Sequence, residues 1–561
     1  MYSRHDSTRA RARATLLLGL MLALPAAARA QEAAHVHTTQ AAHAAPATPG
    51  ERPTPLLDGL GDLHHPISTT DTLAQRYFDQ GLRLAYAFNH GEAIRSFEEA
   101  ARLDPSCAMC YWGKALALGP NINAPMDTAA ARQAYAALQR ARSVAARATA
   151  RERAYIDALA ARYAAEPSAE RAPLDAAYAA AMREVARRAP DDPDAATLFA
   201  EALMDTSPWD YWQADGSPKP ATREILSALE RALARNPNHP GACHYYIHAV
   251  EAVYPERAVA CAERLAALMP AAGHIVHMPG HIYIRVGRYN DAIQANVHAV
   301  HADETYIAER RPEGVYPAGY YPHNYHFLAF AATLAGRSAE AVEAARATVR
   351  HTPVDVARQV PESQLQLAYS HLTLAKFGRW DDVLREPLPP ADLRVASGLA
   401  HYSRGLAFAA RGRWTDAQAA LDSVTRAAAD VGQGPSDAVL DIATYALRGE
   451  IAARRGQLDA AVGHYRTAMT LEDGLGYMEP PYWHTPVRHQ LGAVLLQAGR
   501  AREAEALYRE DLRRFPENGW SLAGLRQSLI AQRKSAEADT VGRRFVTAWQ
   551  KADVPLTTSR R

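Results

Sequence analysis

The chain has 561 residues, of which 48% are hydrophobic and 22% are charged, and its formal net charge is +1. This composition allows a large buried core and excludes gross disorder, and the balanced charge argues against a nucleic-acid partner. The length suits one long repeat array or three to four ordinary domains. Only 4 cysteines are present, so disulfides cannot be the main source of stability.

Residues 1–30 have the features of a secretory signal peptide. A basic lead that includes Arg4 and Arg13 precedes an apolar run over residues 14–24, and Ala28-Arg29-Ala30 predicts cleavage after Ala30. The apolar run is too short to span a membrane. The sequence therefore predicts an exported protein, periplasmic or secreted, that is not membrane-spanning.

Residues 31–70 are rich in Ala, Pro, Thr and His, and this composition predicts a flexible tail. Helical repeats begin at Asp71. The first clear unit, YFDQGLRLAYAFNHGEAIRSFEEAARLDP, has small residues at Gly81 and Ala93, an aromatic residue at Phe97 and a proline at Pro105. Small residues let two helices approach closely, the aromatic ring fills the gap between them, and the proline ends the second helix.

The same pattern recurs around residues 280–299, 336–353, 405–417, 449–468 and 492–516, with weaker units between them. This repetition over residues 71–550 predicts an all-α solenoid of about eleven helix-turn-helix units, some irregular. Residues 551–561 are predicted to form a C-terminal tail. Two insertions break the period, at 205–222 and 302–321, and both are rich in aromatic residues and proline. Insertions in a solenoid usually form loops on one face, often a functional one.

From Asp71 to near the C-terminus the chain resembles tetratricopeptide repeat (TPR) proteins, because its small residues, aromatic residues and prolines recur at the positions of that repeat. The segments HYYIHAVEA, GHIVHMPGHIYIRVGRY, YYPHNYHFLAFAA and EPPYWHTPVRHQLG also resemble a family of exported bacterial TPR proteins. The resemblance implies a right-handed superhelix that binds a peptide or protein partner in a concave groove. It implies an exported location but no reaction.

Histidines gather between Cys243 and Phe330, at spacings of three and four residues that place them on one helix face within each segment. In the TPR register, three consecutive first helices would turn these side chains onto one concave wall. The predicted groove residues are His244, His248, Glu251, His274, His277, His281, Tyr283, Arg285, Tyr321, His323 and His326. A secondary groove surface is predicted from Trp112, Asn121, Asn123, Trp483 and His484.

Two functions fit this surface. The first is a scaffold that binds a peptide, a protein or a small ligand in a groove rich in histidine and tyrosine. The alternative is a metal-binding protein or metalloenzyme, because neutral imidazole suits zinc, copper and iron, and a pair of histidines at i and i+4 supplies two ligands. The metal ligands of this hypothesis are His244, His248, His277, His281, His323 and His326.

No catalytic residue is assigned, because the sequence contains no HExxH, no G-x-S-x-G and no nucleotide-binding glycine loop. A binding protein is therefore favoured over an enzyme. Cys107 and Cys110 open a helix without a thioredoxin-like context, which favours a structural disulfide or two buried thiols. Cys243 and Cys261 lie on the two helices of one unit and are a second candidate disulfide, which requires Cα atoms within about 7 Å.

Overall fold

The computed structural model describes residues 54–167, 170–429 and 434–561. Within these ranges the regular elements are helices, and the only extended pairings are two isolated bridges. The predicted signal peptide and residues 31–53 of the predicted tail lie outside the described residues.

The helices follow one another with short connections along the whole array. The first group comprises α2 (Thr72–Tyr86), α3 (His90–Leu103), α4 (Ala108–Ala117), α5 (Thr128–Ser143), α6 (Ala150–Ala160), α7 (Ala172–Arg188), α8 (Pro193–Met204), α9 (Pro220–Arg235), α10 (Pro240–Val250) and α11 (Val259–Leu268). The middle group comprises α12 (Gly273–His277), α13 (Pro279–Arg285), α14 (Tyr289–Arg310), α15 (Tyr321–Leu334), α16 (Ser338–His351), α17 (Val354–Gln359), α18 (Gln364–Leu367), α19 (Tyr369–Lys376) and α20 (Trp380–Arg385). The last group comprises α21 (Arg394–Ala410), α22 (Trp414–Ala429), α23 (Pro435–Arg454), α24 (Leu458–Asp473), α25 (Val487–Gln497), α26 (Ala501–Arg514), α27 (Gly519–Ala531) and α28 (Ser535–Ala548).

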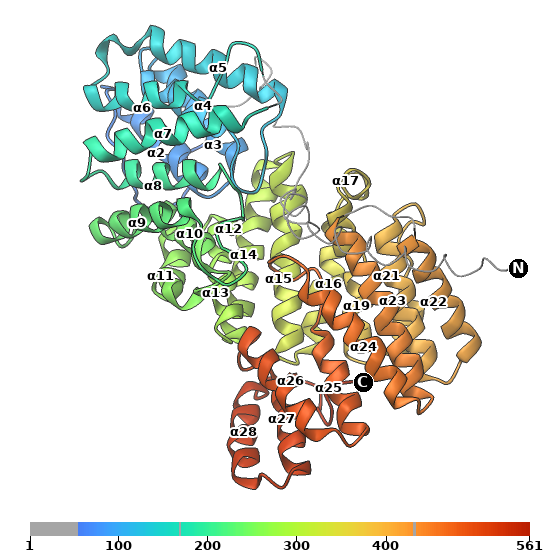
Figure 1. The fold of residues 1–561 in the computed structure, drawn as a ribbon. Coiled ribbons are helices and arrows are strands. Elements are labelled where there is room, and N and C mark those ends of the chain that lie inside the picture. The colour runs from blue at the N-terminus through green and yellow to red at the C-terminus, as the bar shows by residue number, and fades with distance from the viewer. Residues whose placement is uncertain (1–53, 168–169, 430–433) are drawn as a thin grey trace, which may run out of the picture.

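Consecutive helices pack as hairpins, such as α2–α3, α8–α9, α15–α16, α21–α22 and α23–α24, and successive hairpins stack into a curved array (Figure 1). The predicted all-α solenoid of TPR-type hairpins is confirmed. Its packing follows the repeat pattern. A Cβ atom on Gly81 would lie 2.7 Å from the Phe97 ring, and one on Gly449 would lie 2.8 Å from the Tyr465 ring. These glycines therefore let the two helices of each hairpin approach closely around a buried aromatic side chain.

The array curves back on itself, so that α26 and α27 lie against α14 and α15 (Figure 1). The indole N–H of Trp520 donates to the Thr333 carbonyl (2.9 Å), and the Tyr289 hydroxyl donates to the Pro516 carbonyl (2.8 Å). The Phe330 and Phe515 rings also meet edge to face. The C-terminal units therefore pack against the turns of the α13–α14 and α15–α16 hairpins, where Cβ atoms on Gly287 and Gly336 would meet Pro516 and Trp549.

Both predicted tails are packed against the solenoid where the structure describes them. The sequence predicts a flexible segment over residues 31–70, but residues 54–70 lie against α2, where the Tyr77 hydroxyl donates to the Thr54 carbonyl (2.6 Å). Gln80 accepts the Leu57 N–H (2.7 Å). At the other end, Ser559 is buried and its hydroxyl donates to the His489 carbonyl (2.7 Å). The composition of residues 31–70 did not reveal this packing, because side chains on α2 satisfy polar backbone groups of the segment.

The two insertions adopt different structures. Residues 205–219 connect α8 to α9 as a loop. In the second insertion α14 continues as helix through Arg310, Arg311 ends it with a left-handed backbone (φ 47°), and a π-helical turn over Tyr316–Tyr320 leads into α15. The expected loop at 302–321 is thus helical in large part.

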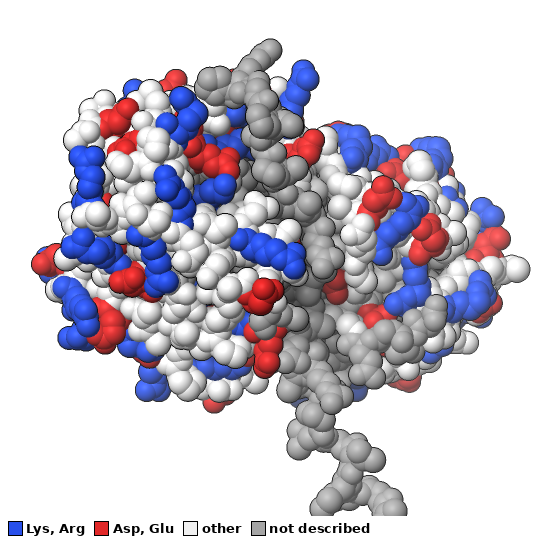
Figure 2. Space-filling model, turned by 90° about the horizontal axis from the view of Figure 1, so that it is seen from above, with Lys and Arg blue, Asp and Glu red and all other residues white. Residues whose placement is uncertain are grey.

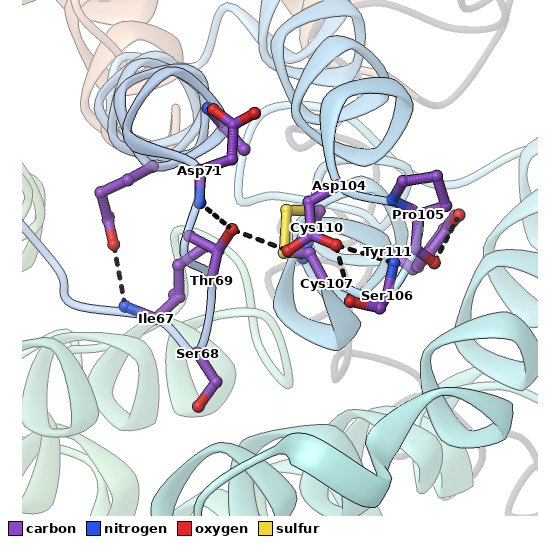
Figure 3. The surroundings of a disulfide bond; sticks show 12 residues. Ile67, Ser68, Thr69, Asp71, Asp104, Pro105, Ser106, Cys107, Cys110 and Tyr111 are labelled. Atoms are coloured by element: carbon purple, nitrogen blue, oxygen red, sulfur yellow. Dashed lines mark hydrogen bonds between the residues drawn. A yellow bond between two sulfur atoms is a disulfide. The ribbon is translucent and has the colours of Figure 1, made fainter.

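Cys107 and Cys110 form a disulfide at the start of α4 (Figure 3). The Cys107 sulfur also accepts the backbone N–H of Cys110 (3.1 Å), so it caps the helix. Cys243 and Cys261, by contrast, are buried free thiols, and the second candidate disulfide is absent. The Cys243 thiol instead donates to the Pro237 carbonyl (3.8 Å).

Replacing both Cys107 and Cys110 with serine is expected to lower the free energy of unfolding by about 2 kcal/mol. The effect is small because the disulfide closes a loop with a sequence separation of only 3, and serine can still cap α4. Thermal denaturation checks this, and reduction of the wild-type protein should give the same shift. A failure of the double variant to fold would contradict the expectation.

Candidate metal centre

Six histidines from three consecutive units meet inside the protein. We call this group the histidine centre. They are His244 and His248 on α10, His274 and His277 on α12, His281 on α13 and His323 on α15. His323 is half-buried, and the other five are almost completely buried. They form two groups of three.

The first trio consists of His244, His248 and His274. The Nε2 atoms of His244 and His248 lie 3.1 Å apart, and those of His244 and His274 lie 3.2 Å apart. One ring nitrogen from each residue lies within 4.8 Å of the other two. Three imidazoles from two different units therefore converge on one point.

The second trio consists of His277, His281 and His323. The Nε2 atoms of His277 and His281 lie 2.9 Å apart, and a ring nitrogen of His323 lies within 4.8 Å of both. The His323 ring centroid is 5.0 Å from that of His277 and 6.0 Å from that of His281. Because His323 is half-buried, this trio forms the edge of the centre that lies nearer to solvent.

In each trio, the Nδ1 atom of one histidine faces a carbonyl oxygen, which can accept a hydrogen bond. His244 Nδ1 lies 2.7 Å from the Tyr86 carbonyl oxygen. His277 Nδ1 lies 2.7 Å from Asn296 Oδ1, and the Asn296 amide is fixed in this orientation because its Nδ2 donates to the Ala292 carbonyl (2.8 Å). A carbonyl oxygen can only accept, so both imidazoles carry their proton on Nδ1.

Glu251 joins the two trios. One carboxylate oxygen lies 2.9 Å from His248 Nδ1, and the other lies 2.5 Å from His281 Nδ1. Burial alone would raise the Glu251 pKa, but the charges and hydrogen bonds of His281 and His248 outweigh it and hold the pKa at about 2. Glu251 is thus an ionised acceptor that keeps a proton on the Nδ1 of both imidazoles.

When both imidazoles of a pair are neutral, these hydrogen bonds leave their Nε2 atoms without protons. In the His244–His248 pair and in the His277–His281 pair, two nitrogen lone pairs face each other at about hydrogen-bond distance. Such a contact is repulsive unless a cation lies between the two atoms. Burial, followed by the neighbouring imidazoles, holds the pKa of His244, His274 and His277 well below the usual value. Protonation at neutral pH is therefore disfavoured, and a metal ion fits the donor set.

Aromatic rings enclose the first trio. The Phe88 ring stacks against His274 (5.4 Å between centroids) and His248 (6.1 Å), and its backbone is left-handed (φ 55°), which is rare for a bulky residue. Trp209 meets His248 edge to face (5.0 Å), and Tyr320 lies against His274 (4.6 Å). Trp209 and Tyr320 come from the two insertions, so both insertions contribute to the wall around the histidines.

A buried hydrogen-bond network positions α10 beneath this wall. Asp194, at the start of α8, accepts from the Tyr86 hydroxyl (2.7 Å) and from His239 Nε2 (3.0 Å). His239 caps α10 by accepting the Ala242 N–H (3.0 Å) on its other nitrogen. Because the Tyr86 carbonyl in turn orients His244, the carboxylate of Asp194 holds α2 and α10 in register.

Several residues predicted from the repeat register lie elsewhere. His326 packs against the Tyr369 ring (4.2 Å), away from both trios, whereas His274, absent from the predicted ligand set, belongs to the first trio. His326 lies outside both trios because its side chain points from α15 toward Tyr369 in the following unit. Tyr283 packs beneath Arg288, and Tyr321 packs beside His351.

Arg285 borders the centre without touching the trios, since it donates to the Glu251 carbonyl (3.2 Å) and pairs with Glu479 (3.9 Å). The predicted secondary groove is not one surface. Trp112 is buried and donates to the Tyr155 carbonyl (3.2 Å), while Trp483 and His484 pack beside Tyr402 in the C-terminal half; these residues lie apart.

The loop after α4 does reach the wall of the centre. Asn123 Nδ2 donates to the Tyr320 hydroxyl (3.4 Å), Asn121 lies 3.4 Å from His90 Nε2, and the Trp209 indole donates to the Ile122 carbonyl (2.9 Å). The histidines are therefore interior groups rather than the lining of an open groove. The sequence alone did not identify Phe88, Trp209 and Asn296 as parts of the centre, although the aromatic content of the first insertion pointed toward Trp209.

No protein-family model and no curated protein matches this chain. Among solved structures, it is similar to the human IFIT1 dimer with PPP-AAAA, at a TM-score of 0.32 and 12% identity over 86% of this chain and 91% of that one. It is also similar to the human IFIT1 dimer with m7Gppp-AAAA, at a TM-score of 0.29 and 12% identity over 85% and 90% of the two chains. We draw no functional conclusion from likeness of this degree.

On the face shown in Figure 2, basic and acidic side chains are interspersed rather than gathered by sign. Of the helices in the described ranges, none is both long and apolar enough to cross a membrane.

Proposed function

We propose that this protein binds two transition-metal ions, one in each histidine trio, on a helical-repeat scaffold. The observation that carries the proposal is the pair of short Nε2–Nε2 contacts between imidazoles whose Nδ1 protons are already committed to acceptors. An all-imidazole donor set suits zinc or copper and does not suit magnesium or calcium, which prefer oxygen ligands.

The spacing of the donor atoms supports this assignment. Imidazole nitrogens that bind one ion at about 2.0–2.1 Å in tetrahedral geometry lie roughly 3.3 Å apart. The observed separations of 2.9–3.2 Å need only a slight outward movement of the rings. Hydrogen bonds from the outer nitrogens to Glu251, Asn296 and the Tyr86 carbonyl are the kind of support that orients metal-binding histidines.

We further propose that the protein works outside the reducing cytosol. The features of residues 1–30 predict export, and the Cys107–Cys110 disulfide is of a kind that persists in oxidising compartments. A centre in the periplasm or outside the cell would take up its ions there.

The test begins with protein that is stripped with a chelator, reloaded with Cu²⁺ or Zn²⁺ and desalted. This protein is expected to hold two ions per chain, as measured by elemental mass spectrometry. The loaded protein should also melt at a higher temperature than the stripped protein, because the ions bind only the folded state. Nitrogen hyperfine structure in the electron paramagnetic resonance spectrum of the copper form would identify the imidazole ligands.

The matched variants are His277→Ala/His281→Ala, expected to retain one ion, and His326→Ala, expected to retain two because His326 belongs to neither trio. Less than half an ion per folded, reloaded chain would refute the proposal. If the His326→Ala variant and the double variant lose the same number of ions per chain, the metal binds elsewhere.

A further inference from the structure

Lys376, at the end of α19, is the one buried lysine among the five in the sequence, all of which lie in the described residues. Its Nζ lies 3.0 Å from His489 Nδ1 and 3.8 Å from the centre of the Trp520 ring. This site lies in the C-terminal half and shares no residue with the histidine centre.

A set of buried hydrogen bonds orients His489, the hydrogen-bond partner of the Lys376 amine. His489 Nε2 lies 3.1 Å from Asp511 Oδ2, an oxygen that also accepts from the Ser521 hydroxyl (2.6 Å) and the Asn518 amide (3.1 Å). Because a carboxylate only accepts, His489 carries its proton on Nε2. Its Nδ1 therefore presents a lone pair to the Lys376 amine.

Among the described residues, no carboxylate forms a hydrogen bond or an ion pair with the Lys376 Nζ, and its hydrogen-bond partner is the His489 imidazole. Burial holds the pKa of Lys376 well below its usual value; the Asp511 charge opposes this effect and the Arg561 charge adds to it. A desolvated amine without a directly paired anion favours the neutral form, in which its lone pair is available as a nucleophile.

A small cavity lies beside Lys376. Its volume is about 30 Å³, room for roughly two water molecules, and its lining includes Lys376, Tyr402, His484 and Arg560. His484 is buried, and its Nδ1 has no hydrogen-bond partner. Two residues that line the cavity thus carry a nucleophilic amine and an unsatisfied polar atom, and its volume admits only a very small molecule.

We propose that Lys376 forms an imine with a one- or two-carbon aldehyde in this cavity. The Nζ lone pair attacks the carbonyl carbon, and the C=O π electrons move to the oxygen. His489 Nδ1 receives the proton that the nitrogen sheds and passes it to this oxygen, which gives a carbinolamine. Loss of water from this carbinolamine then gives the C=N bond. The balance is amine plus aldehyde to imine plus water, without an oxidant or reductant.

The test is competitive labelling of the folded, full-length protein at pH 7 with a limiting amount of acetaldehyde and cyanoborohydride, which traps the imine as an ethylamine. Peptide mass spectrometry reads each lysine. Lys376 is expected to react at least about tenfold faster than exposed Lys551, because a larger fraction of its amine is neutral. Benzaldehyde, too large for the cavity, should label Lys551 but not Lys376.

The His489→Gln variant, with its fold checked by circular dichroism, should reduce the Lys376 rate and leave the Lys551 rate unchanged. If Lys376 is labelled only after unfolding, or no faster than Lys551, the proposal is wrong and the lysine has a purely structural role. Equal labelling of Lys376 by both aldehydes would overturn the size argument and the cavity assignment with it.

Discussion

Replacing Glu251 with glutamine is expected to weaken both metal sites together, by about 10- to 100-fold in affinity. One carboxylate accepts from His248 in the first trio and from His281 in the second. Glutamine has one carbonyl oxygen and one NH₂ group, so it can accept from only one of the two imidazoles and must turn a donor toward the other. Competition with a chromophoric chelator, titrated against zinc, measures both affinities.

The matched control is Asn296→Ala, which removes the acceptor of His277 alone. That variant should weaken one site and spare the other. Glu251→Gln should weaken the site whose imidazole loses its acceptor more than the site that keeps the uncharged amide oxygen. If it affects neither while the protein remains folded, the metal does not bind at the trios.

Replacing Arg162 with methionine is expected to destabilise the protein by about 3–5 kcal/mol. The Arg162 side chain is completely buried, and its guanidinium lies 3.3 Å from Asp175 and 3.6 Å from Glu201, and also pairs with Asp205. Removal of this guanidinium leaves Glu201 and Asp205 buried without their cationic partner, whereas Asp175 still pairs with Arg171 (3.0 Å). Thermal or urea denaturation of the folded variant measures the loss.

The comparison is Arg187→Met, whose ion pair with Glu184 lies on the surface. Because solvent screens that pair, no measurable loss of stability is expected there. Equal stability of the Arg162 variant and the wild type would show that the buried acids are neutral in the folded protein.

The helical architecture could be predicted from the sequence because each hairpin depends on local spacing. The small residue at Gly81 and the aromatic residue at Phe97 are fixed by contacts within one unit, and such contacts leave a periodic pattern. The return of α26 and α27 onto α14 and α15 could not be predicted. It depends on the summed curvature of many units, which no single repeat records.

The same distinction applies to the histidine centre. The His277–His281 and His244–His248 pairs follow from a spacing of four on a helix, and their rings do meet. The choice of His274 over His326 depended on where the neighbouring unit lies. Phe88 joins the centre from more than 150 residues earlier in the chain, and that contact has no local signature.

The ligands of the centre come from three consecutive repeats, α10, α12–α13 and α15. In a stacked array each repeat normally feels only its nearest neighbours, so repeats can open one at a time. The first trio joins two repeats, the second joins the next pair, and Glu251 spans the boundary between them. Two bound ions would therefore fuse these repeats into one cooperative folding block, and the metal supply would set how large a part of the chain opens together.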